Sequence, residues 1–155
     1  MIGMIDARLT DLPLDPAAEL SRFMAKLADE GAVVSFAGIA RPRNRDGADV
    51  ERIFLDHHPR LTQRSIGDIA QAASRRFAVG AITAVHRFGE VLPGETIVFV
   101  AAASLHRRAA FEAADYVMDR LKTDAVLWKR EDSVDGSRWI EPTEADRADR
   151  ARWSE

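Results

Sequence analysis

A run of nine residues without a charged side chain, TIVFVAAAS at 96–104, constrains the fold more than any other stretch of the sequence. Its β-branched and aromatic start, and the turn-forming VLPGE just before it, are typical of a buried strand. We therefore predict an apolar central strand over 96–104. The segment after it predicts a helix from Arg107 to about Lys122, with a buried face made of Ala110, Phe111, Ala114, Val117, Met118 and Leu121.

Helices alternate with pairs of strands along the rest of the chain. Asp15-Pro16 predicts a capped helix start and Gly31 its end, with Leu20, Phe23, Met24 and Leu27 facing inward. Strands are predicted at 32–40, 50–58 and 81–89, a helix at 60–77 with Leu61, Ile66, Ile69, Ala73 and Phe77 inward, a hairpin of 125–131 with 137–141, and a last helix opened by Thr143 and Asp146. Paired strands between single helices indicate an α+β fold with a largely antiparallel sheet.

The length of 155 residues fits one domain, and we predict a single domain over 1–155. A net charge of −3 argues against broad nucleic-acid binding, which needs a strongly basic surface. The chain has no cysteine, which rules out disulfides and thiolate chemistry. Neither a signal peptide nor an apolar run of about 18 residues is evident, so a soluble, cytoplasmic protein without membrane contact is expected.

Two short patterns invite a ligand and are better explained without one. The neighbours His57 and His58 point to opposite faces of a predicted strand, so they cannot easily hold one metal ion. The glycines of GEVLPGE at 89–95 lack the strand and helix context of a phosphate-binding loop and indicate a turn. We therefore expect no metal site and no cofactor.

Basic residues mark two places where an anion could bind. His106 and Arg107 follow Ser104 at the predicted start of a helix, where free backbone N–H groups favour anions. A serine N-cap with exposed basic neighbours explains the same residues equally well. In the loop 41–49 the arginines, Arg41 among them, are either solvated charge or a flexible clamp on a phosphate.

Two lysines lie in the stretch LKTDAVLWKRE at 121–131. Each alone is more simply explained as a surface lysine, because lysine is rarely buried. A lysine that is desolvated or crowded by other cations has a lowered pKa and can act as a base or nucleophile. Lys129 would face away from the core if Trp128 faces it, and we expect both Lys122 and Lys129 to lie near His106 and Arg107.

Five segments together resemble the large, catalytic subunit of molybdopterin synthase, the MoaE-type family. They are GAVVSFAGIAR at 31–41, LDHHPRLT at 55–62, HRFGEVLPGETIVFVAAASLHRRAAFEA at 86–113, DRLKTDAVLWKRE at 119–131 and RWIE at 138–141. They occur in the family's order and span roughly residues 30–142, which makes the resemblance far more specific than one short motif.

The resemblance implies an α/β-hammerhead, which is an α+β architecture, and a sulfurtransferase of molybdenum cofactor biosynthesis. Such an enzyme converts cyclic pyranopterin monophosphate (precursor Z) into molybdopterin by installing two dithiolene sulfurs. The implied sulfur donor is the C-terminal Gly-Gly thiocarboxylate of a small ubiquitin-like subunit. The implied assembly is a heterotetramer around a central dimer of the large subunit.

The resemblance also implies roles for particular residues. Lys122 and Lys129 match the family's two key lysines and are the expected catalytic residues. The expected substrate-binding residues are these two lysines with Ile39, Arg41, His106, Arg107, Arg130 and Glu131. Ala40 lies with Ile39 on the strand end that leads to Arg41, and Phe36 and Met118 are weaker matches to apolar positions near the pocket. In the family the loop arginine reaches the pocket of the neighbouring protomer. Ile39 stands where relatives are often polar or basic, and EPTE at 141–144 lacks a basic residue that some relatives carry.

Two interpretations from other classes remain at this stage. The same basic residues could form a non-catalytic anion- or nucleotide-binding regulatory module. A purely structural partner subunit is the second alternative, although it would not need His106, Arg107, Lys122 and Lys129 together.

Overall fold

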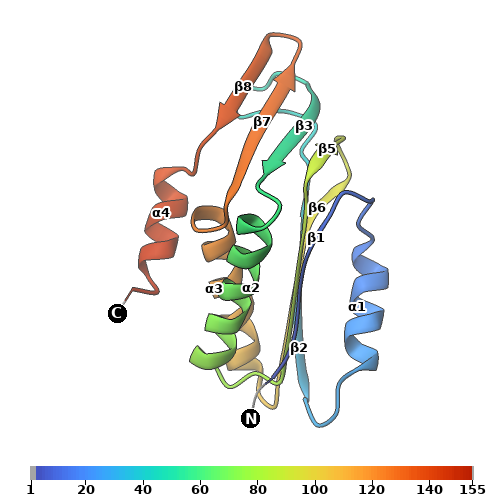
Figure 1. Ribbon diagram of the computed structural model, residues 1–155, viewed down its shortest axis with the longest axis vertical. Helices are drawn as coiled ribbons and strands as arrows, with labels where there is room; N and C mark the ends of the chain where they lie inside the picture. The colour runs from blue at the N-terminus through green and yellow to red at the C-terminus, as the bar shows by residue number, and fades with distance from the viewer. Residues whose placement is uncertain (1–2, 155) are drawn as a thin grey trace.

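The computed structural model describes residues 3–154 and shows two four-stranded sheets with helices beside them (Figure 1). Most strand pairs are antiparallel, and the predicted α+β class is confirmed. The outermost residues of the predicted domain, 1–2 and 155, lie outside the described part. Its extent over 1–155 therefore stays a prediction.

The first sheet holds the predicted central strand. Its order is β1 (Met4–Thr10), β4 (Ala81–Arg87), β6 (Thr96–Ser104) and β2 (Ala32–Ile39). Strand β6 pairs antiparallel with both β4 and β2, and its residues from Val98 to Ser104 are all buried. An uncharged strand is stable here because both neighbours satisfy its backbone and helices cover its two faces.

The second sheet carries the predicted hairpin. Its order is β5 (Gly89–Val91), β3 (Val50–His57), β7 (Leu127–Ser133) and β8 (Gly136–Ile140). Strands β7 and β8 are joined by a short turn that ends at Gly136, whose φ of 121° favours glycine. This sheet extends beyond the upper end of the first one in Figure 1.

Helices cover the first sheet on both faces (Figure 1). Helix α1 (Pro16–Ala25) lies on one face, while α2 (Leu61–Arg76) and α3 (Arg107–Thr123) lie on the other. Helix α4 (Glu144–Ala151) packs on α3 and is held there by Arg150, which donates to Asp124 at 2.9 Å. Of the helices in residues 3–154, none is long and apolar enough to cross a membrane.

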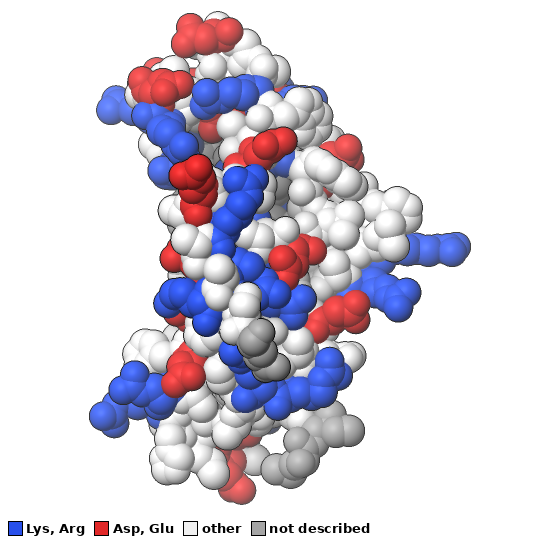
Figure 2. Space-filling model, turned by 90° about the vertical axis from the view of Figure 1, so that its left-hand side faces the viewer, with Lys and Arg blue, Asp and Glu red and all other residues white. Residues whose placement is uncertain are grey.

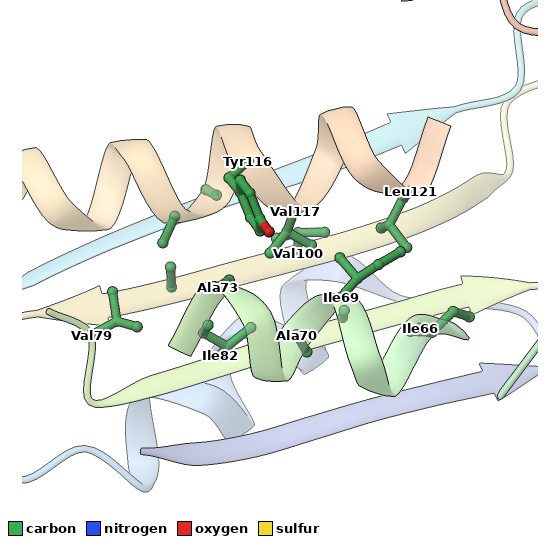
Figure 3. Close-up of a cluster of buried hydrophobic side chains, with 14 of the residues drawn as sticks. Ile66, Ile69, Ala70, Ala73, Val79, Ile82, Val100, Tyr116, Val117 and Leu121 are labelled. Atoms are coloured by element: carbon green, nitrogen blue, oxygen red, sulfur yellow. The ribbon is translucent and has the colours of Figure 1, made fainter. Parts of the chain in front are cut away.

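The main core lies between the first sheet and the pair α2 and α3 (Figure 3). Ile66, Ile69 and Ala73 of α2 meet Val117 and Leu121 of α3 over the sheet. A smaller cluster on the opposite face joins Phe23 of α1 to Val85 and Phe99. Because both of its faces are buried, the first sheet is rigid and holds the residues at its strand ends in fixed positions.

Two strands were not predicted from the sequence. Strand β1 has apolar Ile5, Ala7 and Leu9 alternating with polar residues, a pattern typical of a half-buried strand. Its partner β4 lies more than seventy residues away in the sequence and runs parallel to it, so the pairing cannot be predicted from the residues around β1. Strand β5 is only three residues long and joins the other sheet, which divides the predicted strand 81–89 into β4 and the start of β5.

Four details of the helix predictions are wrong. Helix α1 ends at Ala25 rather than near Gly31, in keeping with acidic Asp29 and Glu30, which a helix C-terminus disfavours. Met24, Leu61 and Phe111 are exposed, although they were expected to face inward. Met24 and Phe111 each lie one residue, and hence about 100° of rotation, away from the buried stripe, and Leu61 is the first residue of α2.

Replacement of Ile69 by alanine should lower the free energy of unfolding by about 2–5 kcal/mol, because this side chain is 1% exposed and its loss leaves a cavity. Leu61→Ala on the same helix is the matched control, and it should change stability by less than about 0.5 kcal/mol because Leu61 is 51% exposed. Denaturant unfolding measures both. Equal losses in the two variants would contradict the packing of α2.

Candidate functional site

Lys122 and Lys129 meet where α3 leads into β7. Lys122 lies in the last turn of α3, and Lys129 is the third residue of β7. The connection between them is pinned to α2, since Val126 donates to the Ser65 hydroxyl at 3.1 Å and its carbonyl accepts from the Thr62 hydroxyl. The two lysines lie close enough for the charge of Lys122 to lower the pKa of Lys129.

Strand register turns Lys129 toward the interior. Lys129 is paired with Leu55 of β3, and paired residues of neighbouring strands point to the same face of a sheet. Leu55 is 3% exposed and belongs to a buried cluster, so Lys129 shares the inner face. Trp128 is exposed and points outward, which means that Lys129, not Trp128, faces inward.

Burial and neighbouring cations together lower the pKa of Lys129. Desolvation of the ammonium group is the largest cause, and the charge of Lys122 follows. The carboxylates of Glu131 and Asp146 act in the opposite direction, while Arg41 adds to the lowering. Lys129 is therefore easier to deprotonate than an ordinary lysine, as a residue that exchanges protons requires.

Asp146 comes to the lysines from the start of α4. Thr143 and Asp146 form the predicted capping box, with Thr143 N–H donating to the carboxylate at 2.9 Å. Burial raises the pKa of this carboxyl, but the hydrogen bonds from Thr143 and the charges of Lys122 and Lys129 outweigh it and leave the pKa lowered. The sequence predicted the cap, whereas the proximity to the lysines depends on how α4 packs.

Arg41 reaches the same place from the end of β2. Ala40, just before it, is 1% exposed and is fixed by two backbone bonds, to the carbonyl of Glu95 at 2.9 Å and from the N–H of Gly94 at 2.8 Å. The backbone at Arg41 is thereby anchored. Ile39 and Phe36 are exposed on β2, which is an edge strand of the first sheet.

Glu131 and Arg130 follow Lys129 on β7 and point to opposite faces. Glu131 is paired with Ile53 on the inner face, the same side as Lys129. Arg130 lies on the outer face, where it donates to Asp132 at 2.9 Å and stacks over the ring of Phe54 at 5.0 Å. The structure thus brings Glu131 to the lysines and directs Arg130 away from them.

His106 and Arg107 lie at the other end of α3. Arg107 is the first residue of the helix and Lys122 lies in its last turn, which separates the two by about 22 Å at the rise of an α-helix. His106 and Arg107 line an open hollow of about 440 Å³ with Gly31, Leu105 and Arg108. The expected proximity to the lysines is therefore wrong within one chain, and Ser104 is a buried strand residue rather than the N-cap.

The other histidines have partners of their own. His57 stacks on Phe88 with ring centroids 3.9 Å apart, and His58 accepts from the N–H groups of Arg60 and Leu61 at the start of α2. Within residues 3–154, no three His, Cys, Asp or Glu side chains gather as a metal site.

His86 of β4 was not singled out from the sequence, yet it lies close enough to both lysines for their charges to lower its pKa. Burial first, and then the charges of Lys122 and Lys129, lower the pKa of His86 to about 4. Its position inside the mainly apolar strand AITAVHR hid it, because a single histidine there carries no local signal of function.

Basic groups gather across the middle of the face that Figure 2 shows, with acidic side chains between them. The lysine site contains three cationic residues, Lys122, Lys129 and Arg41, together with two carboxylates and one neutral imidazole. A partly desolvated cationic cluster of this kind is typical of a site that binds or transforms an anion. Fold and site together define an α+β protein with a lysine pair in a partly desolvated, mainly cationic cluster.

Comparison with known proteins identifies the family. The model of the family described as MoaE protein matches residues 9–124, well over half of the chain, so this protein belongs to that family. A relative from Caulobacter vibrioides, the molybdopterin synthase catalytic subunit, is 47% identical over 147 residues, covering 95% of this chain and 96% of the relative.

Solved structures share the fold. The molybdopterin biosynthesis MoaE protein from Burkholderia ambifaria superposes with a TM-score of 0.79 at 36% identity and covers 97% of each chain. A structure described as the complex of subunits 1 and 2 of molybdopterin-converting factor from Helicobacter pylori has a TM-score of 0.66. It covers 93% of this chain and 92% of that one at 20% identity, which shows likeness of fold alone.

Replacement of Lys122 by methionine should raise the pKa of Lys129 toward its usual value near 10.5, because one repelling charge is removed. Asp146→Asn should lower it further, since a stabilising carboxylate is lost. The chain has three lysines, Lys26, Lys122 and Lys129, so side-chain NMR resolves the titration directly. An identical Lys129 pKa in the wild type and in both variants would show that Lys122 and Asp146 do not interact electrostatically with Lys129.

Proposed function

We propose that this protein is the catalytic subunit of a molybdopterin synthase. The observation that carries the proposal is the meeting of Lys122 and Lys129 at a partly desolvated site, in a chain 47% identical to such a subunit along nearly its whole length. A cytoplasmic location and a single domain over 1–155 belong to the proposal and rest on the family resemblance.

The reaction we assign is the conversion of precursor Z to molybdopterin. Each of two steps replaces a carbon–oxygen bond of the pterin by a carbon–sulfur bond. Water then cleaves the acyl carbon–sulfur bond to the tail, so that the thiocarboxylate ends as a carboxylate. The cyclic phosphate and the thiocarboxylate are both anions, so a cluster of Lys122, Lys129 and Arg41 favours bringing them together. Repulsion between the two reactants is otherwise a barrier to their encounter.

The two lysines receive different roles. Lys129 is half-buried, which suits a group that orients the substrate and stabilises developing negative charge without a full hydration shell. Lys122 is more exposed at the end of α3, which suits contact with an incoming tail and proton transfer there. Glu131 and Asp146 keep the two ammonium groups together by offsetting part of their repulsion.

The sulfur donor we propose is a small ubiquitin-like subunit with a C-terminal Gly-Gly thiocarboxylate. The Helicobacter pylori structure of similar fold is described as a complex of two subunits of molybdopterin-converting factor, which supports a two-protein assembly. Exposed Ile39, two residues before Arg41, and exposed Phe36 further back along edge strand β2 offer apolar surface for such a tail.

A second copy of the chain completes the site in this proposal. Within one chain α3 holds His106 and Arg107 far from Lys122, although all three are expected to bind the substrate. In a central dimer, all three residues can contact one substrate if the start of α3 in one copy lies against the end of α3 in the other copy. The assembly is then a heterotetramer with two composite sites.

Lys122→Ala and Lys129→Ala should each reduce molybdopterin formation at least about 100-fold, as expected when a group that moves protons or stabilises charge is lost. The assay supplies precursor Z and thiocarboxylated small subunit and measures product. Lys26→Ala is the matched control, because Lys26 is exposed at the end of α1, and it should behave as wild type. Near-normal turnover by both site variants would instead favour a non-catalytic anion-binding module.

Mixing two inactive variants tests the composite site. Each composite site takes Lys122 from one copy and Arg107 from the other. In a dimer of one Lys122→Ala copy and one Arg107→Ala copy, one site therefore lacks both residues and the other site keeps both. Random exchange makes about half of the dimers mixed, and activity should recover to about a quarter of wild type. A mixture that stays as inactive as its components would place both halves within one chain.

A further inference from the structure

Arg87, the last residue of β4, is a buried cation that the lysine site does not use. It is 4% exposed. Because strand side chains alternate, it shares a face of β4 with Ala81 and Val85, which pack in the smaller core beside α1. An arginine is almost never buried to this extent unless its charge is compensated.

Two groups compensate Arg87, and both lie in the segment 88–95 that connects β4 to β6. Its Nη2 donates to the carbonyl of Glu90 at 3.0 Å, and its Nη1 lies 3.5 Å from Oε2 of Glu95. The second contact is an ion pair without a hydrogen bond, and Nε and Nη1 have no hydrogen-bond partner among the described residues. The charge of Arg87 therefore depends on the carboxylate of Glu95 for its compensation.

The same carboxylate closes a turn. Oε1 of Glu95 accepts from the N–H of Leu92 at 2.7 Å, and the N–H of Glu95 donates to the carbonyl of Leu92 at 3.0 Å. Gly94, inside the turn, has a φ of 87°, a conformation that favours glycine. One oxygen of the carboxylate thus holds the turn 92–95 while the other faces Arg87.

The turn in its place holds the end of β2. The N–H of Ala40 donates to the carbonyl of Glu95 at 2.9 Å, and the N–H of Gly94 donates to the carbonyl of Ala40 at 2.8 Å. The pairing of β2 with β6 shifts in register just before the end of β2, so these two bonds take over where the regular ladder stops. Arg41 is the next residue, and the turn therefore sets the point from which its side chain leaves the backbone.

We propose that Arg87 is a positioning residue, which fixes the backbone of Ala40 through Glu95 and the turn 92–95 and thereby holds Arg41 in place to bind the anionic substrate. This role rests on the proposed function, and it adds a residue that acts through the backbone rather than on the substrate. Each link from Arg87 to Ala40 is a hydrogen bond or an ion pair between groups in contact.

Amide hydrogen exchange tests these links without turnover. Arg87→Met removes the cation, and it should lower the protection of the Ala40 and Gly94 N–H groups at least about tenfold more than that of residues 98–104 in the centre of the first sheet. Arg87→Lys keeps a cation opposite Glu95 and should stay within about threefold of wild type at both amides. Unchanged protection at Ala40 and Gly94 in Arg87→Met, or an equal loss across 98–104, would overturn the inference even if the protein makes molybdopterin.

Steady-state kinetics test the step from the turn to the substrate. Arg87→Met and Arg41→Met should each raise the KM for precursor Z by about 3–10-fold with little change in kcat, because both weaken the same contact with the anion. The double variant should be no worse than Arg41→Met alone. Losses that multiply in the double variant would overturn the proposal, because they would show that Arg87 acts independently of Arg41.

Arg64→Met is the matched control for both measurements. Arg64 also forms an ion pair, with Asp68 at 3.9 Å, but the pair is exposed on α2. The variant should leave the protection of Ala40 and the KM for precursor Z as in the wild type. An effect of Arg64→Met equal to that of Arg87→Met would overturn the proposal, since any lost arginine would then suffice.

The two measurements also separate this inference from the proposed function. Local loss of protection at Ala40 in Arg87→Met would support the positioning of the backbone even if the protein makes no molybdopterin. Molybdopterin formation with unchanged protection at Ala40 would support the proposed function and overturn the role of Arg87.

Discussion

The rest of the site depends on one constraint, the repulsion between the ammonium groups of Lys122 and Lys129 at a partly desolvated position. Lys129 cannot turn away, because its pairing with Leu55 fixes its face, and Lys122 is fixed by the end of α3. Glu131 and Asp146 offset part of the repulsion but leave the pKa of Lys129 lowered. Part of the positive charge at this site is therefore left uncompensated in the free chain, and binding of an anionic substrate and an anionic tail can compensate it.

Much of the fold follows from local patterns. The uncharged run of β6, the hairpin of β7 with β8 and the capping box at Thr143 were all predictable, because each depends on neighbours in sequence. Strand β1 was missed although its alternation is regular, since its position depends on a parallel partner far along the chain. The predicted buried face of α3 was one residue too wide and included Phe111, which is exposed in the structure.

Less of the site could be predicted, because it forms where distant elements end. Lys122 and Lys129 were identified by resemblance, while pattern alone favoured surface positions for both. Arg130 follows Lys129 directly and yet faces the other way, as alternation on a strand requires. His86 and Asp146 could not be assigned, since their proximity to the lysines arises only when β4 and α4 pack against α3 and β7.

Reconstitution of the whole reaction tests the central claim most directly. Purified protein is incubated with precursor Z and a small subunit that carries a C-terminal thiocarboxylate, and the pterin product is analysed by mass spectrometry. The account predicts a product with two added sulfur atoms and conversion of the tail to a carboxylate, both dependent on this protein. Binding of both reactants without any sulfur transfer would contradict it.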